Sequence, residues 1–157
     1  MGILLFFIRI KMCCTKEAFE MTERFDKVME NHKKGYNCAQ AVACAYSDLY
    51  GVPEVEAFRA TECFGRGMGV MGPCGAVSAM AYLVGLKVSD ANLENPQTKL
   101  DCYNTLKPMQ DGFIAKNQSM DCRTLKGVDT GIVLRSCPGC MEDAAELVEK
   151  YLLGEEK

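Results

Sequence analysis

The chain has 157 residues, of which 48% are hydrophobic and 25% charged, and its net charge is −3. This length supports a hydrophobic core that needs no disulfide bonds, and this composition excludes a largely disordered chain. The acidic balance and the lack of a basic stripe argue against a nucleic-acid partner. The unusual feature is the ten cysteines, a count that indicates a disulfide scaffold, a metal site or redox chemistry.

The N-terminal residues 1–20 are expected to form an irregular leader ahead of a helical, cysteine-rich domain at residues 21–157. The apolar run Met1–Ile8 has no positive charge before it and is too short to cross a bilayer, so we expect neither a signal peptide nor a membrane span. Initiation at Met12 or Met21 and a membrane-peripheral anchor are the alternatives for this segment. The expected location is cytoplasmic, where thiols stay reduced unless they bind metal or take part in a redox cycle.

Helical signals dominate the N-terminal half of the chain. An apolar face at helical spacing predicts a first helix, which Gly35 ends. Asn37 is a good N-cap for an alanine-rich second helix that stops at Gly51. Pro53 suits the first turn of a third helix. These helices are predicted at residues 16–33, 38–50 and 53–63.

The C-terminal half also predicts helices. A glycine-rich loop at residues 64–73 precedes a segment that is apolar all round, which is typical of a buried central helix. Pro108 lies inside the next helix and is expected to kink or divide it. Ser119 can cap a short helix that Gly127 ends. The predicted helices cover residues 74–86, 96–116, 119–127 and about 138 onward.

Strand-like alternation is not sustained anywhere, and residues 131–134 are the only short candidate. The sequence therefore predicts an all-α fold, a single-domain bundle of about six or seven short helices.

Four cysteines fall at predicted helix N-termini. The first turn of a helix has unpaired backbone N–H groups and about half a positive charge, which favour a thiolate over a thiol. The pKa of a cysteine there can fall from about 8.5 to about 3.5–7.5. Because thiolates attack disulfides and bind metal, these residues are candidates both as catalytic thiols and as ligands of an iron–sulfur cluster. They are Cys38, Cys74, Cys122 and Cys137.

A C-x-x-C motif joins Cys137 to Cys140 at the start of the last helix. This is the arrangement of thiol–disulfide exchange centres, with Cys137 the more exposed attacking thiol, and Cys140 is therefore a further catalytic candidate. Zinc is a weaker alternative, because the second cysteine pair of a zinc knuckle is missing and His32 is the only histidine.

The glycine-rich loop offers backbone N–H groups for an anion, so Gly65, Gly67, Gly69 and Gly75 are candidate cofactor-binding residues. The alternative role is close backbone packing that brings Cys74 near its partners. A nucleotide fingerprint is not expected, since no strand precedes the loop.

The remaining cysteines have weaker claims to a functional role. Cys44 lies six residues after Cys38 in sequence, on a different helix face, and is assigned to packing. Cys63 adjoins the glycine-rich loop and is a candidate for a place near the site. Cys102 is assigned to the core, whereas the other two cysteines belong to the leader.

Several segments together resemble the C_GCAxxG_C_C family of redox-active proteins, which is named for a CGAxxG motif and four characteristic cysteines. The resemblance covers nearly everything between Met21 and Leu152. Ala79 stands where the motif has its last glycine, and Cys140 stands where relatives usually carry an apolar residue. The matching segments are Gly35–Val42, Phe64–Gly69, Cys74–Val77, Cys122–Gly127 and Cys137 ahead of Glu142–Leu147.

The resemblance implies a helical fold and redox use of the four family cysteines, which fall at the four helix N-termini named above. Related domains occur fused to cytochromes and are associated with an iron–sulfur cluster. The expected function is therefore redox chemistry by clustered cysteines, through thiol–disulfide exchange or electron transfer.

Two alternatives stay open beside this expectation. The first is an electron carrier with a [2Fe–2S]-type cluster bound by Cys38, Cys74, Cys122 and Cys137. The second is a non-catalytic helical interaction module with structural cysteines, which forms a homodimer through exposed apolar helix faces. The sequence names no redox partner or substrate, and whether the protein is an enzyme stays open.

Overall fold

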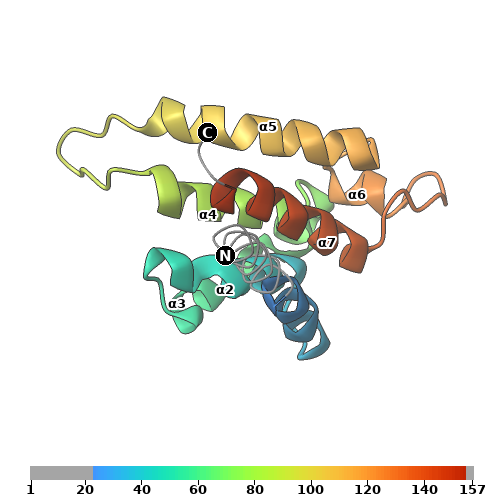
Figure 1. The fold of residues 1–157 in the computed structure, drawn as a ribbon. Helices are drawn as coiled ribbons and strands as arrows, with labels where there is room; N and C mark the ends of the chain where they lie inside the picture. Colours follow the sequence, from blue (N-terminus) through green and yellow to red (C-terminus); the bar gives the residue numbers. More distant parts are fainter. Residues whose placement is uncertain (1–22, 155–157) are drawn as a thin grey trace, which may run out of the picture.

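The computed structural model describes residues 23–154, and these residues form α-helices joined by loops and short 3-10 or π turns (Figure 1). No strand occurs in this described part, where the β-type pairing is an isolated bridge between Pro73 and Asp121. The predicted all-α, single-domain fold is therefore confirmed. The predicted leader at residues 1–20 lies outside the described residues.

The helix bounds follow the predicted order along the chain. Residues 23–33 are helical, and Gly35 ends this helix with a positive φ of 99°. The later α-helices are α2 (Cys38–Tyr46), α3 (Glu54–Thr61), α4 (Gly75–Val88), α5 (Lys99–Asn117), α6 (Cys122–Leu125) and α7 (Cys137–Val148). Four shorter turns accompany them: η1 (Ser47–Tyr50), η2 (Glu62–Phe64), η3 (Gly67–Met71) and η4 (Glu149–Leu153).

Helix α4 is the centre of the bundle. It packs against α2, α5 and α7, and Figure 1 shows it enclosed by these helices. Its apolar residues point in several directions, and Val77, Met80, Leu83 and Val84 are all buried. A helix that is apolar all round is stable only when neighbours cover it, which is why α4 takes the central place.

The starts of α6 and α3 differ from the prediction. The N-cap of α6 is Asp121, whose carboxylate accepts the Thr124 N–H. The Ser119 hydroxyl instead accepts the N–H of Asp121, before the helix begins. Pro53 is the N-cap of α3 and not a residue of its first turn. Asp121 caps α6 in place of Ser119 because its carboxylate is two residues closer in sequence to the unpaired N–H groups of the first turn.

Helix α5 also differs from the prediction. It begins at Lys99 and not at Pro96, and it continues through Pro108 without being divided. Proline removes one backbone hydrogen bond from the helix. Burial of Met109 and Phe113, which follow the proline within the same helix, stabilises the continuation.

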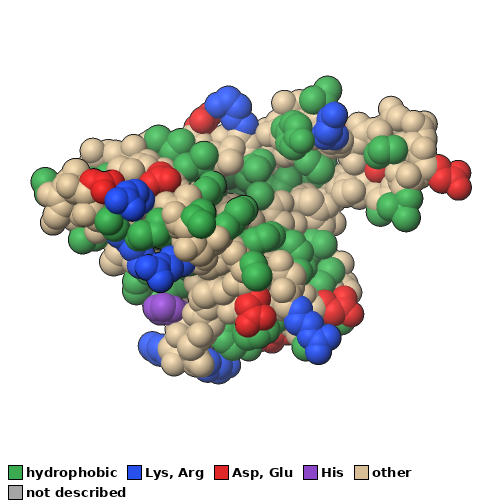
Figure 2. All heavy atoms as spheres, turned by 180° about the vertical axis from the view of Figure 1, so that it is seen from behind, with side chains coloured by type: hydrophobic (Ala, Val, Ile, Leu, Met, Phe, Trp, Pro, Cys, Tyr) green, Lys and Arg blue, Asp and Glu red, His purple; other side chains and the backbone are tan. Residues whose placement is uncertain are grey.

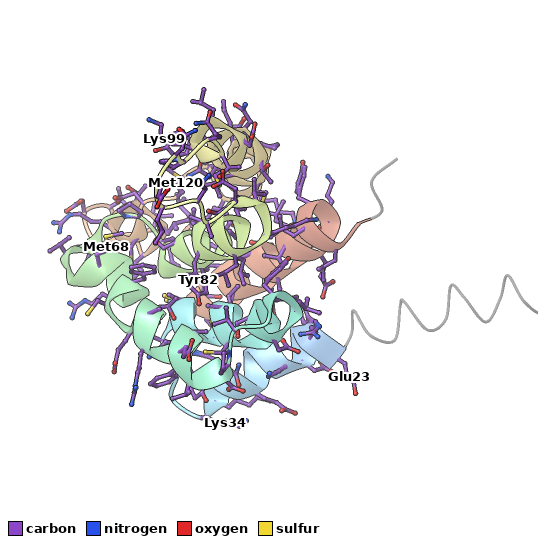
Figure 3. All side chains as sticks on the ribbon, turned by 90° about the vertical axis from the view of Figure 1, so that its left-hand side faces the viewer. Glu23, Lys34, Met68, Tyr82, Lys99 and Met120 are labelled. Atoms are coloured by element: carbon purple, nitrogen blue, oxygen red, sulfur yellow. The ribbon has the colours of Figure 1, made fainter. Side chains whose placement is uncertain are left out.

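The glycine-rich loop folds back on itself before α4. Arg66 and Met68 have left-handed backbone angles, with φ of 53° and 56°, and the Gly72 N–H donates to Gly67 O at 3.0 Å. Figure 3 shows Met68 on the outer side of this loop.

Within residues 23–154, no helix is both long and apolar enough to cross a membrane.

Candidate functional site

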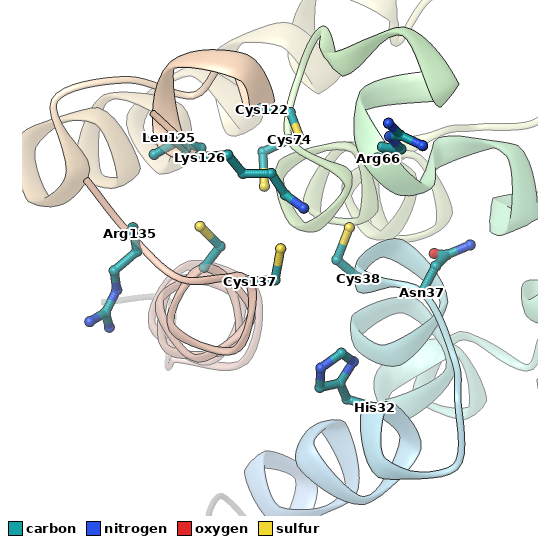
Figure 4. A pocket seen from close by; sticks show the side chains of 11 residues that line it. His32, Asn37, Cys38, Arg66, Cys74, Cys122, Leu125, Lys126, Arg135 and Cys137 are labelled. Atoms are coloured by element: carbon teal, nitrogen blue, oxygen red, sulfur yellow. The ribbon is translucent and has the colours of Figure 1, made fainter. Parts of the chain in front are cut away.

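Five cysteines line one cavity of about 200 Å³ (Figure 4). They come from the starts of four different helices, so residues up to about 100 positions apart in sequence meet there. The cysteines are Cys38, Cys74, Cys122, Cys137 and Cys140. The other lining residues are His32, Asn37, Arg66, Leu125, Lys126 and Arg135.

Helix capping positions two of the N-terminal cysteines at the cavity. Asn37 caps α2 through a capping box, and Ser136 caps α7 by accepting the Gly139 N–H. The first residues of these helices are Cys38 and Cys137, respectively. Each sulfur therefore starts beside the unpaired N–H groups of a first turn, as the sequence predicts.

Two backbone hydrogen bonds join α4 to α6 at the cavity. The Cys74 N–H donates to Met120 O, and the Cys122 N–H donates to Gly72 O, both at 2.7 Å. Cys74 is the N-cap of α4, and Cys122 is the first residue of α6. This pairing fixes the relative position of the two cysteines.

Gly75 allows α2 and α4 to approach closely. A Cβ atom at this position would lie 2.5 Å from Cys38 Sγ and 2.9 Å from Phe64 O. The hydrogen atom of glycine leaves the space that the Cys38 sulfur occupies. The glycine that follows Cys74 is therefore required by packing at the site.

Cys74 is the thiol that the pocket favours as a thiolate. A hydrogen bond from the Cys140 thiol, the N–H groups of Ala76 and Val77 and the charge of Lys126 together outweigh burial. These interactions lower the pKa of Cys74 to about 7. Hydrogen bonds to a charged form and an opposite charge nearby both favour that form.

Three neighbouring thiols have a raised pKa. The hydrogen bond to Cys74, followed by burial, raises the pKa of Cys140. Burial, with a further contribution from the charge of Cys74, raises the pKa of Cys38 and of Cys122. The pocket thus combines one thiolate with adjacent thiols that retain their protons, which is the state that an attacking thiolate and a second, resolving thiol require.

Lys126 brings a positive charge to the sulfur atoms. Figure 4 shows its side chain crossing the pocket, with the amino group directed toward Cys38 and Cys137. Arg135 is arranged differently, because its Nε donates to Asp143 at 2.9 Å. Figure 2 shows basic side chains beside the single histidine of the chain at this end of the molecule.

The four glycines named as cofactor-binding candidates do not line the cavity. A Cβ atom at Gly65 would meet the Asn37 side chain at 2.6 Å, and one at Gly67 would meet the Gly72 backbone at 2.5 Å. Gly69 has no atom within 4 Å of such a Cβ. Close packing, the alternative that the sequence left open, describes Gly65, Gly67 and Gly75.

The other cysteines of the described chain lie outside the pocket. Cys63 is exposed and does not line the cavity, although it adjoins the glycine-rich loop. Cys44 is buried, and its thiol donates to Glu54 O at 3.7 Å. Cys102 is half-buried and packs against the core. The two leader cysteines fall outside residues 23–154.

Sequence reasoning missed Lys126 and Arg135 as lining residues. Lys126 follows Cys122 by four residues at a helix start, and positions i and i+4 are neighbours on a helix face. This spacing could have indicated that Lys126 lies beside Cys122. Arg135 lies in a loop, and no sequence spacing indicates its position.

The donor set of the pocket suits a soft metal or an iron–sulfur cluster, because several thiols and N–H donors meet there. No group of three or more Cys, His, Asp or Glu residues in the described range is arranged to hold a metal ion.

Comparison with known proteins identifies a family. Residues 36–151 match the family described as "Putative redox-active protein (C_GCAxxG_C_C)". No curated protein and no solved structure matches the chain. The family match covers well over half of the chain and includes all five pocket cysteines. The chain therefore belongs to the C_GCAxxG_C_C family.

Proposed function

We propose that the pocket carries out reversible thiol–disulfide chemistry, with Cys74 as the attacking thiolate and Cys140 as the second thiol of the couple. The observation that carries the proposal is the meeting of Cys74 and Cys140 in one cavity, where the interaction between the two thiols is the main cause of the lowered pKa of Cys74. Two sulfur atoms that line the same small cavity can come within bonding distance by a small movement. Membership of a family described as redox-active supports the same chemistry.

The exchange proceeds in two steps. The Cys74 thiolate attacks one sulfur of a substrate disulfide, which forms a mixed disulfide and releases one substrate thiolate. Cys140 then gives its proton to the departing group, and its sulfur attacks Cys74, which forms the Cys74–Cys140 disulfide and releases the second substrate thiol. Two electrons pass from the protein dithiol to the substrate, and the reverse sequence regenerates the dithiol.

This assignment changes the partner that the C-x-x-C motif suggests for Cys140. The motif pairs it with Cys137, which is half-buried and is the more exposed of the two, as predicted. The sulfur hydrogen-bonded to Cys140 belongs to Cys74. Cys137 therefore becomes a flanking thiol, and its pairing with Cys140 is the competing outcome.

Peptide mapping separates the two pairings. Trypsin places Cys74 alone in peptide 67–87 and both cysteines of the motif in peptide 136–150. After oxidation with a small disulfide, we expect a loss of two free thiols that reductant restores, and a cross-link between these peptides. Cys63→Ser, which changes an exposed cysteine outside the pocket, is the matched control and should keep the cross-link.

Three results would contradict the proposal. An unchanged thiol count would show that no disulfide forms. A bridge confined within peptide 136–150 would assign the couple to Cys137 and Cys140. Persistence of the cross-link between peptides 67–87 and 136–150 in Cys140→Ser would assign the partner of Cys74 to Cys137.

An iron–sulfur cluster is the second candidate, supported by the meeting of five thiols beside Lys126 in one cavity. Anaerobic reconstitution with iron and sulfide tests it. Stable visible absorption with bound iron, lost in Cys38→Ser and in Cys122→Ser but kept in Cys63→Ser, would favour the cluster. A colourless protein without iron would favour exchange chemistry.

A further inference from the structure

The two sulfur atoms assigned to exchange are almost fully buried. Cys74 exposes 5% of its surface and Cys140 exposes 3%, so a substrate reaches them only through the cavity. At about 200 Å³, the cavity is smaller than the roughly 300–1,000 Å³ of typical ligand pockets. A disulfide on the surface of a folded protein cannot enter with its backbone, and the substrate must therefore be a small molecule.

The charge at the cavity selects among small molecules. No Asp or Glu of residues 23–154 lines the cavity, whereas several basic side chains do. Arg135 is already neutralised by Asp143. Lys126 and Arg66 form no ion pair with a carboxylate within that range. Together these two charges exceed the single negative charge of the Cys74 thiolate.

We propose that the pocket takes small disulfides that carry negative charge, and that Lys126 binds this charge beside the reacting sulfur atoms. This inference rests on the proposed function and names its substrate class. The Lys126 side chain extends across the pocket, and its amino group lies among the cysteines, as Figure 4 shows. An anionic group that enters the cavity is therefore close to this amino group. An opposite charge a few ångströms away, at a partly desolvated site, changes a rate by roughly an order of magnitude.

A charge series of similar disulfides tests the proposal. The probes are 3,3′-dithiodipropionate, bis(2-hydroxyethyl) disulfide and cystamine, which carry two negative charges, none and two positive charges. The readout is the rate at which Cys74 is lost as a free thiol, measured by alkylation and mass spectrometry near neutral pH. The quantity compared is the anionic rate divided by the neutral rate, because a change in thiolate population slows all probes by the same factor.

We expect Lys126→Met to lower this ratio about 5- to 10-fold and to raise the corresponding cationic ratio. Lys126→Arg should keep the wild-type ratio, because it keeps the charge. Lys99→Met is the matched control: it removes an equal charge from the start of α5, at the other end of the molecule from α6 (Figures 1 and 3). In the wild type, high ionic strength should lower the anionic ratio.

Equal ratios in Lys126→Met and Lys99→Met would overturn the proposal. The salt dependence of the wild-type ratio decides the question even when Lys126→Met does not fold, because a ratio insensitive to salt excludes recognition by charge. Failure of the proposed function has a different signature. In that case none of the three probes modifies Cys74, whereas failure of the charge preference alone leaves all three reactive.

Discussion

Helix α2 joins two sulfur environments that differ in chemistry, one at the pocket and one against α3. Its first residue, Cys38, faces the pocket, while Cys44 lies six residues later against α3. Burial, with a contribution from Glu54, raises the pKa of Cys44 to about 11. In the pocket, hydrogen-bond donors and Lys126 lower the pKa of Cys74 to about 7. Burial alone makes a thiol inert, and donors aimed at the sulfur reverse that effect.

The largest expected effect is the difference in ionisation between Cys74 in the pocket and Cys44 in the second half of α2. At pH 7 about half of Cys74 is a thiolate, whereas only about one part in ten thousand of Cys44 is ionised. Because the pKa of Cys74 is lowered, thiolate absorbance in the ultraviolet should rise as the pH increases through about 7. Cys74→Ser should remove this transition, and the matched variant Cys44→Ser should keep it. A first transition only near pH 9 in the wild type would refute the comparison.

The next effect concerns the packing that makes the pocket possible. Gly75→Ala places a methyl group against Cys38 Sγ, and we expect a loss of about 1–3 kcal/mol in the free energy of unfolding. Gly85→Ala on the same helix is the control. No atom lies within 4 Å of its new Cβ, and alanine is the better helix former, so stability should increase by up to about 1 kcal/mol.

Urea denaturation of both glycine variants measures these changes. The ultraviolet titration should also lose its transition near pH 7 in Gly75→Ala alone, because displacement of α2 or α4 changes the donors around Cys74. Equal stability of the two variants would mean that α2 and α4 do not require the glycine.

The smallest effect is expected at the cap of α7. The Ser136 hydroxyl accepts the Gly139 N–H at 3.2 Å. Ser136→Ala leaves this N–H without its side-chain partner and should lower the free energy of unfolding by about 1 kcal/mol. Ser136→Thr keeps the capping oxygen and should retain most of the stability. Urea denaturation checks both variants, and an equal loss in each would indicate a packing role for Ser136 instead of a cap.

Local sequence signals predicted most of the helices and part of the site. Asn37 caps α2 as expected, whereas α2 ends at Tyr46 and Gly51 ends the 3-10 turn that follows it. The prediction at Ser119 was wrong because two capping residues, Ser119 and Asp121, stand close together, and the first turn selects the nearer one. Pro108 does not divide α5, because the burial of apolar side chains along this helix, which local propensity does not include, stabilises it.

The pairing of Cys140 could not be predicted from the sequence. The C-x-x-C motif suggests Cys137 as the partner of Cys140 because the two are three residues apart, whereas Cys74 is 66 residues from Cys140 in sequence. Only the packing of α4 against α7 brings Cys74 to the hydrogen-bonding position. The charge of Lys126 is likewise visible in the sequence, but its direction into the pocket is not.

The sequence by itself determined that the chain is helical and that four cysteines stand at helix starts, because capping and helix termination depend on residues within a few positions of each other. The tertiary structure decided which cysteine has the lowered pKa, which thiol interacts with it and which lysine lines the pocket. Those properties depend on distances between separate helices, and such distances are set by how the apolar faces of α2, α4 and α7 pack together.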